Sequence, residues 1–353
     1  MAIPVPRIGL LPSGRRDAIT DVAGVTVGHA TLDEGDVHTG VTVVRPHGGD
    51  PYLQRVPAGF AVLNGFGKSV GLVQVEELGV LETPIALTNT FSVPAVAAAQ
   101  IRQCVEAHPD CGRDLPTVNP LVFECNDGFL NDIQRMAVGE ADYLRAWSDA
   151  GEVFAQGSVG AGRGMTSFAL KGGIGSASRR SGAHTVGALV LANYGRLDNL
   201  VIAGHAVGAQ IATQLSDTPP AGPEKGSIII LIATDAPLDA RQLRRLSLRA
   251  GAGLARTGSV FGHGSGDIAL AFSTAYTLPQ RPTAPMPAVT VLHDALLDGL
   301  FQAVADSVEQ AILHALWQAS TFVGRDGHVR PALTELLRDW PHAAFAPFTF
   351  KPS

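Results

Sequence analysis

The chain has 353 residues, of which 46% are hydrophobic and 16% are charged, and its formal net charge is −6. This composition excludes an intrinsically disordered protein and is sufficient for a large buried core. The negative net charge gives no electrostatic reason to expect nucleic acid or an anionic membrane as a partner.

The N-terminal segment lacks the features of a signal peptide. Residues 1–12 contain three prolines and no sustained apolar run,. No stretch of the chain reaches 18 uninterrupted apolar residues, which is the approximate minimum for a membrane-spanning helix. We therefore expect a soluble, cytoplasmic protein.

Short runs rich in β-branched residues predict strands along the whole chain. Many of these runs are almost continuously apolar, as expected for sheets that are buried on both faces. The predicted strands cover residues 22–27, 41–44, 185–192, 200–203, 227–233 and 267–272.

Three segments between these runs have the residue spacing of helices. Residues 93–105 are rich in alanine and follow a possible cap at Ser92, and Asp239 is a possible cap for a second helix,. The clearest helix runs from about Leu297 to about Ala319, where apolar residues recur every three or four positions,. Alternating strands and helices indicate helices layered over sheets. This pattern is also compatible with a doubly wound sheet.

Residues 216–226 are rich in proline and glycine and predict an exposed loop,. The composition does not change across this loop, so we expect no domain boundary there and treat residues 1–353 as a single domain.

The sequence supports neither a metal site nor a nucleotide site. The eleven histidines are scattered, and no H-x-x-x-H or C-x-x-C pattern occurs,. Cys104 and Cys111 could pair, but reduced, buried thiols are the expected state for these and for Cys125. The glycine-rich segments do not match the patterns of phosphate-binding loops. We expect no cofactor.

The dipeptide Gly258–Ser259 is the most informative pair of residues in the chain, because it lies between a helical segment and the strand predicted at 267–272. If the bond before Ser259 breaks, that residue carries both a hydroxyl and a free α-amine, whose reference pKa is about 7.7–8. A base near neutrality beside a nucleophile is sufficient for acyl transfer. By itself, a Gly-Ser pair is more typical of a turn.

The sequence around this dipeptide, and along most of the chain, resembles the family of L-aminopeptidase/D-amidase/D-esterases and β-peptidyl aminopeptidases. The resemblance extends from about Ile19 to about Ala319. It rests on residues 19–29 (ITDVAGVTVGH), 84–90 (PIALTNT), 124–132 (ECNDGFLND), 160–165 (GAGRGM), 171–179 (KGGIGSASR), 193–195 (NYG), 233–238 (ATDAPL) and 255–259 (ARTGS).

The resemblance implies an αββα sandwich, in which two stacked sheets lie between helical layers. This arrangement is similar to that of N-terminal-nucleophile hydrolases but has a different connectivity. It also implies a precursor that cleaves itself before Ser259 into residues 1–258 and 259–353, which remain together as one folded unit.

The resemblance also implies the roles of individual residues. Ser259 would be the nucleophile, and the side-chain amide of Asn193, at the end of a buried strand, would hold the oxyanion. Relatives orient the new α-amine with a serine and a glutamate before the last helix. This chain has no serine there, and Asp298 is the nearest acidic residue, followed by Asp294. A role of Asp298 as a helix cap is the alternative.

Four further residues near these motifs have a structural interpretation and a functional one. Ser265 lacks the flanking glycines of a nucleophile elbow and is expected in a turn. Phe129 is expected in the core, although some relatives place a tyrosine hydroxyl there. Arg163 could meet a substrate carboxylate or lie on the surface. His263 is close to Ser259 in sequence, which alone does not indicate a Ser-His pair.

The sequence therefore predicts a self-processing serine aminopeptidase or amidase that acts on small peptides or amino-acid amides. Relatives suggest a homo-oligomer, namely a tetramer of processed pairs. Two alternatives remain at this point: an acyltransferase resembling ornithine acetyltransferase, and an unprocessed protein that binds a small molecule. The sequence leaves open whether the substrates are L-peptides, D-amino-acid amides or β-peptides.

Overall fold

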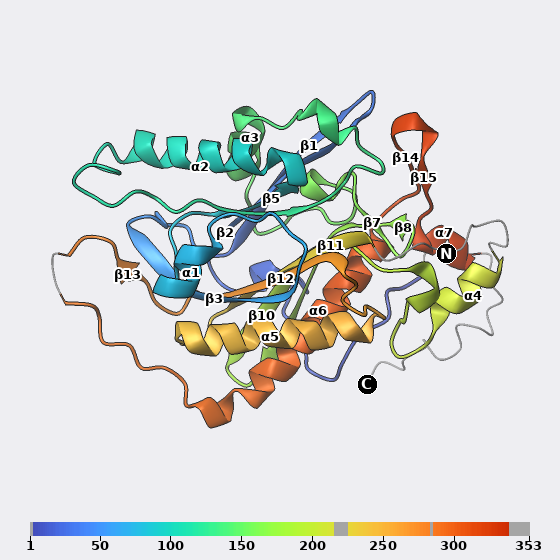
Figure 1. Ribbon diagram of the computed structural model, residues 1–353. Helices are drawn as coiled ribbons and strands as arrows, with labels where there is room; N and C mark the ends of the chain where they lie inside the picture. Colours follow the sequence, from blue (N-terminus) through green and yellow to red (C-terminus); the bar gives the residue numbers. More distant parts are fainter. Residues whose placement is uncertain (1–2, 215–224, 283–284, 339–353) are drawn as a thin grey trace.

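A computed structural model describes residues 3–214, 225–282 and 285–338 (Figure 1). Within these residues, two main sheets lie face to face. The smaller sheet has the strand order β1 (Thr26–Glu34), β2 (Val37–Arg45), β5 (Ile85–Asn89) and β6 (Leu121–Cys125). The larger sheet has the order β13 (Leu278–Pro279), β3 (Gln54–Gly65), β12 (Gly264–Ser273), β11 (Lys225–Thr234), β10 (His184–Asn193) and β9 (Gly173–Ser181), and β4 (Val80–Leu81) pairs with β3.

The two facing sheets share one apolar core. Val44 and Phe123 enter it from the smaller sheet, and Leu189, Leu231 and Leu270 enter it from the larger sheet. All five side chains are buried. The continuous apolar runs of β10 and β11 follow from this arrangement, because helices cover the other face of the larger sheet.

Helices cover the outer face of each sheet (Figure 1). On the larger sheet, α5 (Ala240–Arg256) and α6 (Asp298–Trp317) form a second apolar core with the face that points away from the smaller sheet. On the smaller sheet, α2 (Val93–Ala107) and α3 (Glu140–Ser148) form a third core. The order of layers is therefore helix, sheet, sheet, helix, and the expected αββα sandwich is confirmed.

The remaining helices and strands of the described residues are shorter. They are η1 (Ile19–Asp21), α1 (Leu72–Leu78), η2 (Thr90–Ser92), η3 (Ile133–Arg135), η4 (Gly160–Gly162), β7 (Thr166–Ser167), β8 (Leu170–Lys171), η5 (Leu197–Asn199), α4 (Val207–Gln214), η6 (Asp294–Leu296), β14 (Phe322–Val323), η7 (Arg325–Gly327), β15 (Val329–Arg330) and α7 (Leu333–Arg338).

The three predicted helices are confirmed, but one predicted cap is wrong. Asp239 caps α5, because its carboxylate accepts from the N–H of Gln242 at 2.7 Å, and the Gln242 side chain accepts from the Asp239 N–H at 3.2 Å,. The side chain of Ser92 makes no capping hydrogen bond at the start of α2. Asn89 caps the preceding turn instead, by accepting from the Ser92 N–H at 3.0 Å.

Two predicted strands differ from the structure. Residues 200–203 form a turn, closed by an isolated bridge between Ile202 and His205, and Ala203 has φ +49°. Only Leu200 and Ile202 of this segment are buried, by packing in the helix-side core of the larger sheet and not by strand pairing. The strand expected at 22–27 begins only at Thr26. Of the loop expected at 216–226, residues 216–224 lie outside the described residues, and the last two residues belong to β11.

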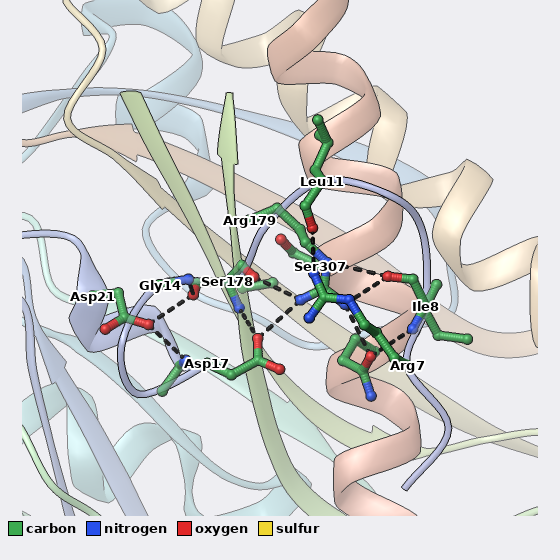
Figure 2. A network of polar contacts seen from close by, with 12 residues as sticks. Arg7, Ile8, Leu11, Gly14, Asp17, Asp21, Ser178, Arg179 and Ser307 are labelled. Atoms are coloured by element: carbon green, nitrogen blue, oxygen red, sulfur yellow. Dashed lines mark hydrogen bonds and ion pairs between the residues drawn. The ribbon is translucent and has the colours of Figure 1, made fainter. Parts of the chain in front are cut away.

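Arg179 on β9 is fully buried and joins the N-terminal segment to α6 (Figure 2). Its guanidinium donates to the Ile8 carbonyl at 2.8 Å and to Asp17 at 2.9 Å. It also donates to the side-chain oxygen of Gln310 at 2.9 Å. Because all these acceptors surround one charge, the cost of burying the guanidinium is offset.

None of the helices in the described ranges has the length and apolarity needed to cross a membrane.

Candidate active site

The chain makes a tight turn at Gly258, directly after α5. Gly258 has φ +100°, and a Cβ at this position would lie 1.8 Å from the carbonyl oxygen of Asn199. Both facts require glycine, because other residues rarely adopt this conformation and the backbone of η5 leaves no space for a side chain. Gly258 therefore brings the start of the next segment against the end of η5.

Thr257 fixes this turn to the end of β10. Its side chain is fully buried and donates to the Leu254 carbonyl at 2.7 Å. The same hydroxyl lies 2.7 Å from the hydroxyl of Tyr194, and the Thr257 carbonyl accepts from the Val201 N–H at 3.0 Å. Tyr194 follows β10 directly, so the turn and the carboxyl end of β10 lie together.

Ser259 is almost buried, with 7% of its surface exposed. Its Oγ accepts from the Phe261 N–H at 3.2 Å. Phe261 has φ +53°, which is unusual for a bulky side chain and indicates a strained backbone two residues after Ser259,. The following residues, His263 and Gly264, lie on the lining of a cavity.

Asn193 is the last residue of β10, and its side-chain amide is held on both sides. Its Oδ1 accepts from the Thr166 N–H at 2.9 Å, and its Nδ2 donates to the Asn126 carbonyl at 2.9 Å. The amide nitrogen carries two hydrogens, so its second N–H is not used by the bond to Asn126 and can donate to a ligand. Asn193 is 5% exposed and lines the same cavity as His263.

The cavity has a volume of about 590 Å³, which is in the usual range for small-molecule sites,. Ser259 is not among its lining residues, although His263 and Gly264, four and five positions later, are. The residues that line it are Phe66, Lys68, Thr90, Glu124, Asn126, Phe129, Thr166, Asn193, Gly226, Ser227, His263, Gly264 and Arg330.

Glu124 contributes a buried carboxylate to the cavity. It lies near the end of β6 and is 3% exposed. One carboxylate oxygen accepts from the backbone N–H of Lys68 at 2.8 Å, and the other accepts from the hydroxyl of Thr90. These bonds fix the carboxylate without neutralising it, so the cavity favours a cationic group beside Glu124.

The hairpin β14–β15 forms another part of the rim, where it packs on the loop that contains Phe129. The Phe129 ring lies between the imidazole of His328, with ring centroids 4.6 Å apart, and the guanidinium of Arg330, 3.6 Å from the ring centroid. Phe129 is 37% exposed and lines the cavity, so its expected position in the core is wrong.

Asp298 does not lie with Ser259 and Asn193. It is exposed, it is the first residue of α6, and Leu297 takes the cap position. The adjacent Gly299 packs on Ser181, at the turn between β9 and β10. Asn193 lies at the opposite end of the ten-residue strand β10. At about 3.3 Å per residue, the two ends are roughly 30 Å apart.

Asp294 is also remote from the turn, because it pairs with the first turn of α5. It accepts two hydrogen bonds from the guanidinium of Arg241, at 2.8 and 2.9 Å. Hydrogen bonds from Arg241 and Gln242 hold the pKa of the Asp294 carboxyl well below its usual range. Within one chain, neither acidic candidate is close to the amine that Ser259 would release.

The remaining candidates have structural partners. Ser265 is the second residue of β12, and its hydroxyl donates to Asp267 at 2.5 Å. Arg163 forms an ion pair with Asp33 and stacks on Phe322, 4.0 Å from the ring centroid, so its side chain is already paired.

Lys171 supports the loop that holds Asn193. It is fully buried, and its ammonium donates to the carbonyls of Gly162, Met165 and Gly172 at 3.1, 2.8 and 2.8 Å. Burial lowers the pKa of this lysine well below its usual value. The loop between these carbonyls contains the Thr166 N–H that bonds to the Asn193 side chain.

Glu124, Arg330 and Lys171 were not predicted as site residues, although Glu124 and Lys171 lie in motifs of the family resemblance. A charged residue within an apolar run, as in 121–125 (LVFEC), is the signal that could have identified Glu124. All three cysteines are free and buried, and the sulfurs of Cys104 and Cys111 are 3.9 Å apart. In the described part of the chain, no group of three potential ligands could hold a metal ion.

Comparisons with known proteins agree on one family. The model of peptidase family S58 matches residues 17–330. The β-peptidyl aminopeptidase BapA of Sphingosinicella xenopeptidilytica is 38% identical over 335 residues, which cover 88% of this chain and 83% of that protein.

Two solved structures resemble the whole chain. A β-aminopeptidase of a Burkholderia species has a TM-score of 0.89 and 41% identity, and the match covers 98% of each chain. The L-aminopeptidase D-Ala-esterase/amidase of Ochrobactrum anthropi has a TM-score of 0.86 and 35% identity, and the match covers 96% of each chain. The latter is described as a variant of the Ntn hydrolase fold.

Proposed function

Because the chain belongs to peptidase family S58, and is therefore a hydrolase of peptide or amide bonds, we propose that it is a serine aminopeptidase that activates itself by cleavage before Ser259. The observation that carries the proposal is the turn at Gly258. It brings Ser259 to the same end of the larger sheet as the amide of Asn193 and the cavity beside it.

In the proposed reaction, the hydroxyl of Ser259 attacks the substrate carbonyl and gives its proton to the α-amine of the same residue. The reference pKa of that amine, about 7.7–8, suits a base near neutral pH. The tetrahedral intermediate carries a negative charge on the former carbonyl oxygen. The second N–H of the Asn193 side chain would stabilise this oxyanion. The intermediate then collapses: the scissile bond breaks, and the α-ammonium of Ser259 gives the proton back to the leaving amine. Water attacks the remaining ester and releases the acyl group from the Ser259 hydroxyl.

The buried carboxylate of Glu124 supports an aminopeptidase and not an endopeptidase. It lines the cavity, and its two hydrogen-bond donors are neutral groups. A substrate with a free ammonium group would supply the missing positive charge. An internal segment of a peptide has no such group and would leave the carboxylate desolvated without a partner.

The fold explains why the two fragments would stay together after cleavage. Strand β12, which belongs to residues 259–353, lies between β11 and β3, which both belong to residues 1–258. Across the proposed cut, Arg256 pairs with Asp306 of α6 at 2.8 Å. Removing the smaller fragment would open the larger sheet at its centre, so cleavage frees the ends at the turn without dissociation.

Substitution of the nucleophile tests this proposal. Ser259→Ala should give one uncut chain without activity on amino-acid amides, whereas the control Ser265→Ala should still be cut before Ser259. An active Ser259→Ala variant would refute the nucleophile.

The choice among L-peptides, D-amino-acid amides and β-peptides stays open in this proposal. The proposal also includes a tetramer of processed pairs, which the family resemblance implies, and a cytoplasmic location, which is expected from the sequence. Sedimentation of the purified protein and cell fractionation would test them.

A further inference from the structure

The cavity lined by Asn193 combines an acidic group and a basic group that come from different elements of the fold. Glu124 lies at the end of β6, and Arg330 is the last residue of β15. The two side chains form no ion pair with each other. Glu124 has a place in the proposed function, as the partner of the substrate's ammonium group. The proposed function assigns no role to Arg330.

The contacts of Arg330 position its guanidinium but do not neutralise its charge. Its guanidinium stacks on the Phe129 ring at 3.6 Å, and one terminal nitrogen donates to the Val329 carbonyl at 3.3 Å. Its buried Nε has no hydrogen-bond partner, and among the described residues no carboxylate lies within ion-pair distance. Burial lowers the pKa of this guanidinium.

Other basic residues near the site are already paired. Arg163 forms an ion pair with Asp33. Arg325, on the same hairpin as Arg330, pairs with Asp326 and donates to the Gly128 carbonyl at 2.8 Å.

Lys68 is the other basic residue on the lining. Its ammonium lies over the Phe66 ring at 4.1 Å, and its backbone N–H bonds to Glu124. Lys68 therefore belongs to the side of the cavity that contains Glu124, and Arg330 is the basic group on the Phe129 side.

Stacking determines which part of Arg330 is open to a ligand. Phe129 covers one face of the planar guanidinium, whose N–H donors lie in the plane of the group, along its edge,. This edge matches the geometry of a carboxylate, which can accept two parallel hydrogen bonds from it. An anionic group at this position would also remove the cost of an unpaired, partly desolvated charge.

We propose that Arg330 binds the free C-terminal carboxylate of a short peptide substrate and determines specificity for unblocked dipeptides and tripeptides. This inference rests on the proposed function, because it places the ammonium of the same substrate at Glu124. A cavity of about 590 Å³ has room for a molecule of this size,. Amides and esters without a carboxylate are then poorer substrates of the same site.

The test compares kcat/KM for alanyl-alanine and for alanyl-alanine amide. The wild-type protein should prefer the free acid by tenfold or more, which is about the effect of one charged hydrogen bond. In Arg330→Gln, kcat/KM for the acid should fall by about tenfold to a hundredfold, while the value for the amide should change less than about twofold. Arg330→Lys keeps the charge and should retain part of the preference.

Two control variants distinguish a loss of carboxylate binding from a loss of the hairpin's structure. Arg325→Gln loosens the same hairpin without touching the cavity lining, and it should affect both substrates equally. Lys68→Gln removes the other basic group and should leave the preference for the acid intact. Equal losses for both substrates in Arg330→Gln, no preference in the wild-type protein, or a preference that depends on Lys68 would each overturn the assignment.

A binding measurement keeps this test distinct from that of the proposed function. Calorimetry with the uncut Ser259→Ala protein needs no turnover and uses the same two peptides as probes. Tighter binding of the free acid, lost in the double variant with Arg330→Gln, supports the assignment even if catalysis follows another mechanism. Equal binding of both peptides contradicts it.

Discussion

Gly258→Ala tests the geometry of the turn on which the active site depends. The new Cβ would meet the carbonyl oxygen of Asn199 at 1.8 Å, and the backbone would keep φ +100°. The left-handed backbone costs about 1–2 kcal/mol for a residue with a Cβ, and forcing the neighbouring backbone apart adds about 1–3 kcal/mol. The expected loss of stability is therefore about 2–5 kcal/mol.

Gly35→Ala is the matched control. Gly35 has φ +58°, and a Cβ there meets nothing within 4 Å, so only the backbone term of about 1–2 kcal/mol applies,. Both changes should be made in the Ser259→Ala background, so that every variant remains one chain.

Thermal unfolding measures the difference between the two variants. At about 2.1 cal/mol/K of unfolding entropy per residue, 1 kcal/mol shifts the Tm of a 353-residue chain by about 1.3 °C,. We expect a decrease of about 1–3 °C for Gly35→Ala and about 3–7 °C for Gly258→Ala. Equal decreases would refute the close approach of Gly258 to η5.

Three further predictions concern the site. Asn193→Ala should lower kcat by about a hundredfold to a thousandfold without moving the pH midpoint, because it removes an oxyanion donor and no titrating group; full turnover would place the oxyanion hole elsewhere. Asp298→Asn should leave kcat/KM and its pH profile unchanged, because Asp298 lies roughly 30 Å from Asn193; a shifted profile would restore its role at the amine. Lys171→Met should lower the Tm by about 4 °C or more, since three buried carbonyls lose their donor,; an unchanged Tm would contradict this.

The individual strands and helices could be predicted because they depend on local patterns, whereas the stacking of two sheets was implied only by the family resemblance. The apolar runs of β10, β11 and β12 indicated strands buried on both faces, and the spacing in α5 and α6 indicated their core-facing sides. Residues 200–203 have the same apolar character but form no strand: the Val201 N–H donates to the Thr257 carbonyl, and Ile202 pairs only with His205 in a turn. A contact between residues nearly 60 positions apart leaves no local signal.

The candidate site was predicted only in part, for a similar reason. Ser259 follows the predicted helix α5, and Asn193 ends the predicted strand β10. The motifs that contain these two residues could therefore be located in the sequence. Asp298 was chosen by its distance along the chain, whereas α6 begins at the far end of the larger sheet. Glu124 and Arg330 line the same cavity only because the hairpin β14–β15 packs on the loop that follows β6, which no spacing indicates.

The intact mass of the denatured protein tests the central claim most directly. The proposed cleavage predicts two fragments, residues 1–258 and residues 259–353, and N-terminal sequencing of the smaller one should begin at Ser259. A single chain of 353 residues that hydrolyses amino-acid amides, or a smaller fragment that begins at another residue, would contradict the claim that Ser259 is the N-terminal nucleophile.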